Sequence, residues 1–268
     1  MLIDFIQLIG GFLLLVWAAD RLVAGASATA RNLGVAPLII GLVIVGFGTS
    51  APELVVSAVA TVRGNSGLAV GNAIGSNIAN MGLILGFTAV IYPLRLESST
   101  LKREYPLLLL IMLVSLFMAI DMQLTRTEGF VLLGCLFAMI AWLVRFGMQR
   151  PASDPFAQEL EAEIPTDIPT RVAMFWLLIS MIALPASSHF LVEGAVGIAK
   201  TLNVSDTVIG LTIVAFGTSL PELATAITSA FRKEDDLAIG NIIGSNMFNL
   251  LGVLGIAAAI KPVEVQSM

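Results

Sequence analysis

The sequence predicts an all-α integral membrane protein of about eight transmembrane helices, arranged as two inverted-topology repeats. Of its 268 residues, 57% are hydrophobic and only 12% are charged, and the mean hydropathy is +0.94. A soluble domain typically has about 25% charged and about 45–50% apolar residues. The other two observations are a series of apolar stretches long enough to cross a bilayer and a repeat at constant spacing between the two halves of the chain.

Eight apolar stretches of about 17–25 residues, each bounded by charges or turn residues, are predicted to span the membrane. The N-terminus lacks the basic region and cleavage site of a signal peptide, so the first stretch is interpreted as a retained span. The predicted spans are 3–20, 37–61, 68–91, 105–122, 128–146, 171–199, 206–230 and 237–260.

The distribution of Lys and Arg predicts the orientation of these spans, because cytoplasmic loops carry an excess of both residues. Ten of the 14 Lys and Arg residues fall on one side of the predicted spans and four on the other. We therefore expect the N-terminus outside the cell and, with eight spans, the C-terminus outside as well.

The segment 147–170 differs in kind from the spans. It contains four prolines and five acidic residues, a composition typical of a solvated linker. The chain therefore divides into a first repeat at 1–146, a cytoplasmic linker at 147–170 and a second repeat at 171–268. The net charge of −5 argues against a nucleic-acid partner, which would require a basic surface.

The repeat is visible at a constant offset of 169 residues. GLVIVGFGTSAPEL at 41–54 matches GLTIVAFGTSLPEL at 210–223 at 11 of 14 positions. GNAIGSNIAN at 71–80 matches GNIIGSNMFN at 240–249 at 7 of 10 positions. The second and seventh predicted spans are five spans apart, so they cross the bilayer in opposite directions, as inverted repeats of secondary transporters do.

The first motif predicts a broken helix at membrane depth. Pro52 lacks a backbone donor and clashes with the carbonyl of Gly48, so the turn is expected to open. Irregular backbone inside a membrane is tolerated only where it is buried in protein or lines a cavity. Such broken helices, with free carbonyl oxygens, hold Na⁺ in secondary transporters.

The same motif places one glutamate in each repeat inside an apolar segment. Glu53 follows Thr49 by four residues and Ser50 by three, so the three side chains can share a helical face. A charge at the bilayer centre costs about 2.5–3.5 kcal/mol on insertion scales, and intramembrane acids are functional by default. The second copy supplies Thr218, Ser219 and Glu222.

The second motif adds polar residues spaced by four, which fall on one stripe of a helix. The first copy has Asn72, Ser76 and Asn80, and the second has Asn241, Ser245 and Asn249. Two glycines in each copy are expected to allow close helix packing. We expect the serine and the last asparagine of each stripe to face the site. The glycines are Gly71, Gly75, Gly240 and Gly244.

Together the motifs present only oxygen ligands, which hard cations prefer. Ca²⁺ takes 6–8 oxygens at about 2.3–2.6 Å, whereas Mg²⁺ dehydrates reluctantly. Two ionised glutamates would balance one Ca²⁺. Na⁺ and protons could use the same oxygens, and competition for the shared carboxylates would make transport an exchange.

On these motifs, GTSAPE at 48–53, GTSLPE at 217–222 and the two GN-x-x-GSN-x-x-N segments, the chain resembles the cation/calcium antiporter superfamily in its sodium/calcium exchanger branch. The resemblance covers nearly the whole chain. It implies alternating access, Na⁺-driven Ca²⁺ transport, a sliding gate formed by the first and sixth spans, and no enzyme activity or cofactor. The short linker, in place of a large regulatory domain, suggests a prokaryotic member in the inner membrane.

Transferred position by position, the resemblance implies that Glu53 and Glu222 are the Ca²⁺ carboxylates. The remaining implied ion-binding residues are Thr49, Ser50, Thr218, Ser219, Ser76, Asn80, Ser245, Asn249, Gly46 and Ala215.

Two departures from the family pattern leave alternatives open. Asn80 and Asn249 are both amides where some members have one acid, which leaves ion stoichiometry and K⁺ dependence undecided. The family usually has ten spans, so the chain is also interpreted as lacking two helices of the second repeat. The alternatives are a H⁺-coupled cation antiporter and a truncated, transport-inactive protein that binds cations. An intramembrane hydrolase is disfavoured by the repeat symmetry.

Overall fold

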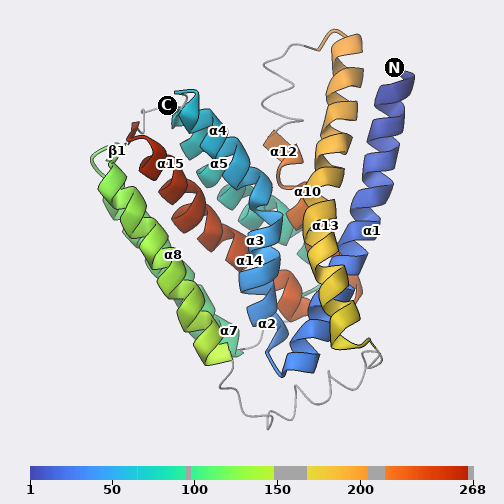
Figure 1. Ribbon diagram of the computed structural model, residues 1–268, viewed down its shortest axis with the longest axis horizontal. Coiled ribbons are helices and arrows are strands. Elements are labelled where there is room, and N and C mark those ends of the chain that lie inside the picture. Colours follow the sequence, from blue (N-terminus) through green and yellow to red (C-terminus); the bar gives the residue numbers. More distant parts are fainter. Residues whose placement is uncertain (65, 95–97, 148–167, 205–214, 265–268) are drawn as a thin grey trace.

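The computed structural model describes residues 1–64, 66–94, 98–147, 168–204 and 215–264. The described chain is helical except for one two-residue ladder (Figure 1). The elements of the first repeat are α1 (Leu2–Leu33), α2 (Pro37–Ile40), η1 (Gly41–Val45), α3 (Gly46–Thr49), α4 (Ala51–Val62), α5 (Ser66–Ile78), η2 (Ala79–Leu85), α6 (Gly86–Ile91), α7 (Ser98–Met118), β1 (Gln123–Leu124) and α8 (Arg126–Gly147). Those that follow are α10 (Thr170–Thr201), α12 (Ala215–Gly217), α13 (Leu220–Phe231), α14 (Asp235–Phe248), η4 (Asn249–Val253), α15 (Leu254–Ile260) and β2 (Val263–Glu264).

Five described helices are long and apolar enough to cross a membrane, and the bent pair Pro37–Thr49 and Ala51–Val62 makes a sixth. A shorter apolar helix, Glu104–Met118, lies where the fourth span is predicted. Residues 206–214 of the predicted seventh span and most of the predicted linker 147–170 lie outside the described residues. The all-helical membrane fold is confirmed.

The first span is longer than predicted. The prediction ended it at residue 20, but α1 continues without a break to Leu33, where Gly34 adopts a left-handed conformation (φ 66°) and ends it. The charges at Asp20 and Arg21 were interpreted as a membrane boundary. Instead, Asp20 accepts a hydrogen bond from Arg232 Nε at 2.9 Å. The Arg21 guanidinium lies 5.0 Å from the ring centroid of Trp176, so both charged side chains contact distant parts of the chain.

α1 and α10 form a closely packed pair at one side of the molecule (Figure 1). Glycines bring the two backbones together: a Cβ at Gly11 would lie 2.6 Å from the backbone nitrogen of Leu191. A Cβ at Gly25 would lie 2.7 Å from the backbone nitrogen of Leu177, on the same helix. Such approaches drive helix association in membranes. The pair can therefore behave as one two-helix unit.

The second span is broken where the first motif predicts. Helix α3 ends at Thr49, and Ser50 leaves the helical region with φ −80° and ψ 4° before α4 starts. The axes on the two sides differ by 43°. Ser219 has nearly the same backbone angles in the second copy, φ −89° and ψ 5°, with Pro221 in the first turn of α13. Both copies therefore break at the serine two residues before the proline.

The third and eighth spans contain π-helical turns at matching positions. These are η2 and η4, which contain Asn80 and Asn249 respectively. π-Helical turns are rare and occur frequently at functional sites. Apolar periodicity alone did not predict them.

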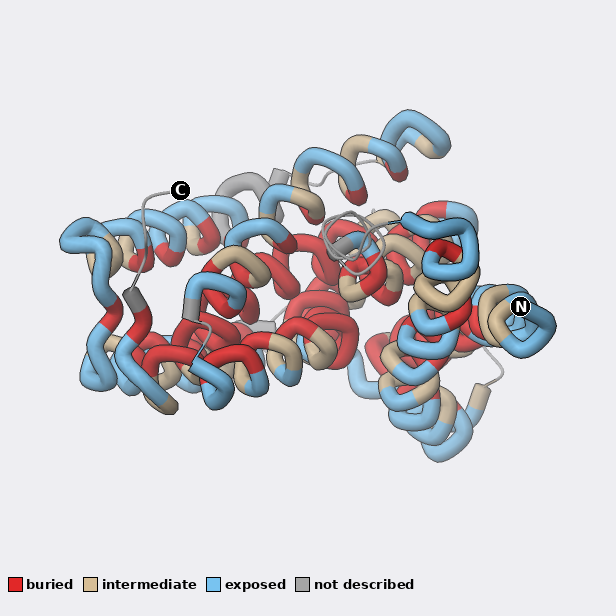
Figure 2. Tube along the Cα trace, turned by 90° about the horizontal axis from the view of Figure 1, so that it is seen from above, coloured by how far each residue is buried: buried red, intermediate tan, exposed pale blue. Residues whose placement is uncertain are grey.

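The eighth span, α14 with η4 and α15, forms the centre of the molecule. Of the most apolar 18 residues in Asp235–Ile260, 89% are buried, against 22% of those in Gly67–Ile91. Buried residues concentrate in this interior, while outward faces of the surrounding helices are exposed (Figure 2). Many exposed residues are large and apolar, as expected for surfaces that face lipid.

Candidate cation-binding site

Glu53 and Glu222 lie at equivalent places in the two repeats, both inside the protein. Each occupies the first turn after a break, on α4 and α13, and their exposed fractions are 0% and 1%. The N-terminus of a helix carries partial positive charge, which favours a carboxylate there. The breaks therefore place two acids at helix starts inside the bundle.

The oxygens of these carboxylates are largely without protein donors. Both Glu53 oxygens and Glu222 Oε2 are buried and have no hydrogen-bond partner. The fourth oxygen, Glu222 Oε1, accepts a hydrogen bond from Ser50 Oγ at 3.2 Å. In the described part of the chain, neither acid forms an ion pair with Lys, Arg or His. Burying a charge without compensation is very costly, so the site requires a cation or protons.

The hydroxyl of Thr49 links the two repeats at this point. Thr49 Oγ1 donates to Asn241 Oδ1 at 3.0 Å and lies 3.1 Å from Ser245 Oγ. The carbonyl oxygen of Gly46 accepts a hydrogen bond from Ser245 Oγ at 3.4 Å. Predicted site residues of the second span thus meet those of the eighth.

A pair of asparagines supports both glutamates in the same way. Asn72 Nδ2 donates to the backbone oxygen of Glu53 at 3.2 Å, and Asn241 Nδ2 donates to that of Glu222 at 3.4 Å. Both asparagines begin the predicted polar stripes but were not included in the predicted ion-binding set. They fix the backbone that carries each acid.

Three of the other predicted residues, Ser76, Ser219 and Asn249, are buried. The hydroxyls of Thr218 and Ser76 lie close to the Glu53 carboxylate, and the Ser219 hydroxyl is buried without a partner. Asn249 is fully buried, and neither its amide oxygen nor its nitrogen has a partner. Ala215 begins α12, two residues before the GTSLPE segment at 217–222.

Two further asparagines, Asn77 and Asn246, were not predicted from the sequence to take part in these contacts. Asn80 Nδ2 donates to Asn246 Oδ1 at 3.1 Å, and Asn77 Nδ2 donates to the backbone oxygen of Asn246 at 3.2 Å. Asn77 and Asn246 match each other at the 169-residue offset. Their identity in both copies was the signal that could have identified this contact between the third and eighth spans.

The predicted glycine packing is confirmed in the second copy. A Cβ at Gly240 would lie 2.6 Å from the Leu38 carbonyl oxygen, and one at Gly244 would contact the Leu42 backbone. The equivalents of Leu38 and Leu42 in the second repeat, residues 207 and 211, lie outside the described part. At Gly71 and Gly75 a Cβ would meet no atom of the described residues within 4 Å, so the close packing predicted for the first copy is not seen there.

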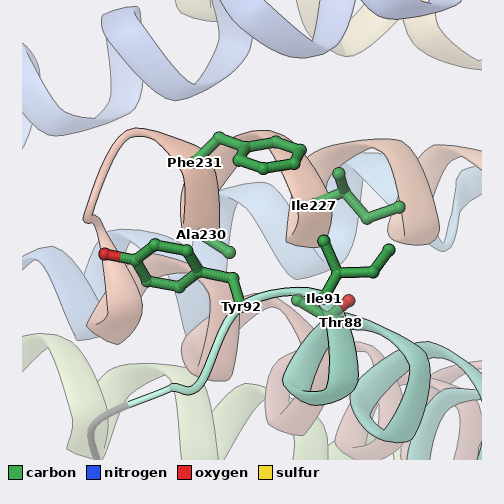
Figure 3. A pocket seen from close by; sticks show the side chains of 6 residues that line it. All are labelled: Thr88, Ile91, Tyr92, Ile227, Ala230 and Phe231. Atoms are coloured by element: carbon green, nitrogen blue, oxygen red, sulfur yellow. The ribbon is translucent and has the colours of Figure 1, made fainter.

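The site is distinct from an apolar crevice between α6 and α13 (Figure 3). The crevice has only two side-chain oxygens, from Thr88 and Tyr92, and no charged group. It is therefore not a cation site. Its lining residues are Thr88, Ile91, Tyr92, Ile227, Ala230 and Phe231.

The fold and the site together define a class: a multi-pass membrane protein with two repeats that meet at two buried carboxylates and a set of hydroxyl, amide and carbonyl oxygens. No group of three or more His, Cys, Asp or Glu gathers in the described residues. The ligands suit hard cations such as Ca²⁺ and Na⁺ rather than transition metals.

The chain belongs to the sodium/calcium exchanger protein family, whose model matches residues 3–145 and 172–268. It is therefore a member of a transporter family within the cation/calcium antiporters. It is 49% identical over 262 residues to the putative antiporter CaxA of Alkalimonas amylolytica, covering 98% of this chain and 82% of that protein. It is 43% identical to the inner membrane protein YrbG of Escherichia coli (strain K12), covering 100% and 83%.

A further relative is the sodium/calcium exchanger MaX1 of Methanosarcina acetivorans, 32% identical over 99% of this chain and 85% of that protein. Among solved structures, the sodium-calcium exchanger NCX_Mj soaked with Na⁺ and Sr²⁺ superposes with a TM-score of 0.86 at 30% identity. That match covers 99% of this chain and 84% of the other. The fold is therefore that of the family.

Proposed function

We propose that this protein exchanges Na⁺ for Ca²⁺ across the membrane at one site that contains Glu53 and Glu222. The observation that carries the proposal is the set of three buried carboxylate oxygens without a protein donor. Two related proteins are named sodium/calcium exchangers, MaX1 and NCX_Mj. Both support Na⁺ as the coupling ion.

Charge balance supports competition between the two ions. Two ionised carboxylates neutralise one Ca²⁺, and the nearby hydroxyl, amide and carbonyl oxygens suit its coordination number of 6–8. Na⁺ uses the same kinds of oxygen at broken helices. Because the carboxylates are shared, binding of Na⁺ displaces Ca²⁺, which makes the transport an obligatory exchange.

Alternating access follows from the repeat. Both copies break at matching serines, and the two halves run in opposite directions, so each can open the shared site to one side. The α1–α10 unit is the element that moves relative to the rest. The distribution of Lys and Arg favours an inner-membrane orientation with the N-terminus outside.

The test is ⁴⁵Ca²⁺ uptake by proteoliposomes loaded with Na⁺ and diluted into Na⁺-free buffer. The expected result is uptake that requires internal Na⁺ and falls to the protein-free level in Glu53→Gln and in Glu222→Gln. Glu128→Gln is the matched control, because Glu128 caps its own helix by accepting hydrogen bonds from Thr125.

Uptake that persists without Na⁺ but needs a pH gradient would replace this proposal with H⁺-coupled exchange on the same scaffold. If Ca²⁺ stabilises the purified protein against heat but no uptake occurs, the chain binds cations without transporting them.

A further inference from the structure

An ion pair joins the α1–α10 unit to the rest of the protein at one end of the bundle. Asp20 of α1 pairs with Arg232, which directly follows α13 and precedes α14. Two nitrogens of Arg232, Nε and Nη2, donate to the same oxygen of Asp20. The pair therefore ties α1 to the turn that connects α13 to α14.

α1 also covers the carboxylate of Glu234 in the same turn. Glu234 is only 7% exposed. Ser27 and Arg31 of α1, together with Arg232, are the groups that stabilise its charged form. The segment of α1 from Asp20 to Arg31 thus lies across the end of the α13–α14 hairpin, and we name this contact the α1 latch.

Beneath the latch, α13 carries hydroxyls on the same face as Glu222. Thr225 and Ser229 follow that acid by three and seven residues, the spacing of one helical face. Both are fully buried, and neither hydroxyl has a partner. The face leads from the carboxylate to the turn that α1 covers.

The matching end of the first repeat lacks the residues that make the latch. At the 169-residue offset, Asp20 corresponds to His189 and Glu234 to Asn65, while Arg232 corresponds to Arg63. An acid facing an arginine in one repeat thus corresponds to a histidine in the other. His189 instead lies 3.2 Å from Glu193 on its own helix, and Glu193 accepts a hydrogen bond from Gln7 of α1. These contacts stay within the α1–α10 unit.

In a transporter of inverted repeats, the two access states exchange the conformations of the two halves. An ion pair whose residues have no counterpart at the other end therefore stabilises only one state. We propose that the α1 latch biases the protein toward the state in which the Arg232 end of the site is closed. The proposal rests on the proposed function for its meaning in transport, but the contacts themselves do not.

The size of the bias follows from the exposure of the pair. The side chains of Asp20 and Arg232 are 42% and 40% exposed. Ion pairs of this kind are weak, so losing the pair is expected to shift the state ratio by about 1.4- to 5-fold.

The test measures how fast a buried cysteine reacts with a water-soluble thiol reagent. Cys135→Ala first removes the one native cysteine. Ser229→Cys then reports on the Arg232 end, and Ala60→Cys, at the equivalent position of the first repeat, reports on the other end. Both positions are buried, at 0% and 5% exposure. Asp20→Asn is expected to raise the labelling rate of the Ser229→Cys reporter by about 1.4- to 5-fold and to lower that of the Ala60→Cys reporter, because the two states interconvert.

Two further variants make the test specific to the ion pair. Asp20→Glu keeps the charge and should retain the native labelling rate at both reporters. His189→Asp places an acid at the position equivalent to Asp20, so it should slow labelling of the Ala60→Cys reporter and speed labelling of the Ser229→Cys reporter.

Either of two results in Asp20→Asn would contradict the proposed bias. These are an unchanged labelling rate at the Ser229→Cys reporter and an equal rise at both reporters. Labelling does not require transport, so failure of Na⁺/Ca²⁺ exchange would leave this result readable by itself.

Discussion

Ser50 illustrates how single residues in this protein serve the opposite repeat. Ser50 and Glu53 have the spacing of a capping box, in which the serine and glutamate side chains cap their own helix. No side-chain hydrogen bond caps α4. The hydroxyl instead donates to Glu222 of the other repeat, and Glu53 is left with both oxygens free of donors. The Ser50 hydroxyl therefore serves the shared site and does not cap its own helix.

Asn241 is predicted to control cation affinity without providing a charge. Its side chain accepts a hydrogen bond from the Thr49 hydroxyl and donates one to the backbone oxygen of Glu222. Loss of such supporting contacts at metal sites typically costs 10–100-fold in affinity. We expect Asn241→Ala to weaken Ca²⁺ binding by at least about 10-fold in equilibrium dialysis.

The control for this variant is Asn32→Ala. Asn32 is an exposed asparagine that donates to the Ile168 carbonyl at the surface, so its loss should leave Ca²⁺ affinity unchanged. Equal affinity of Asn241→Ala and the native protein would show that Asn241 only packs.

The buried carboxyl of Glu234 is expected to make the free energy of unfolding depend on pH. It lies in the turn between α13 and α14, and burial raises the pKa of its carboxyl above its ordinary value, although Ser27, Arg31 and Arg232 oppose the rise. The folded protein then binds this proton more tightly than the unfolded chain. The free energy of unfolding falls as the pH rises from the unfolded pKa through the folded one.

Near pH 4, Glu234→Gln should therefore have the same unfolding temperature as the native protein. At pH 7, its unfolding temperature should be higher than that of the native protein. The measurement is thermal unfolding in detergent across this range. A variant that is less stable than the native protein at pH 7 would contradict the prediction.

At the scale of elements, the broken helices were predictable and the length of α1 was not. Pro52 and Pro221 force a break wherever they occur inside a span, because their effect is local and steric. The continuation of α1 past Asp20 and Arg21 depends instead on contacts with Arg232 and Trp176, which lie far along the chain. A charge marks the end of a span only if no distant partner satisfies it.

Long-range contacts also account for the other departures. The fourth span was predicted to run to residue 122, but α7 ends at Met118. Beyond it, β1 pairs antiparallel with β2, and this ladder joins the loop before α8 to the residues after α15. The pairing connects segments that are distant in the sequence, and neither strand has an alternating pattern long enough to predict it.

Packing of α1 on α10 is predicted to depend on Gly11. A Cβ at that position would lie 2.6 and 2.8 Å from backbone atoms of Leu191, which cannot move aside without displacing α10. Gly11→Ala should lower the free energy of unfolding by about 1–3 kcal/mol, the usual cost of overpacking. The measurement is the unfolding temperature in detergent.

The adjacent Gly10 provides the matched control, since a Cβ there meets no atom within 4 Å. Gly10→Ala should be as stable as the native protein. Equal stability of the two alanine variants would mean that the close approach of the helices does not stabilise the α1–α10 unit.

At the scale of the whole molecule, the two repeats are symmetric at the site and asymmetric around it. Equivalent glutamates, serines and asparagines meet at the centre, as the 169-residue offset predicted. Burial differs greatly between the third and eighth spans, and the ionic contacts of α1 and α10 differ at the two ends. Sequence identity between the copies predicted the shared chemistry, whereas the asymmetry arises from residues that differ between them.

The central claim is that both repeats form one cation site. The most direct measurement is ⁴⁵Ca²⁺ bound per chain by the purified protein in equilibrium dialysis, with Na⁺ as competitor. We predict one Ca²⁺ per chain, displaced by Na⁺, and loss of this binding in Glu53→Gln and in Glu222→Gln alike. Full binding that survives in either single variant would contradict the claim, because each carboxylate would then serve a separate site or none.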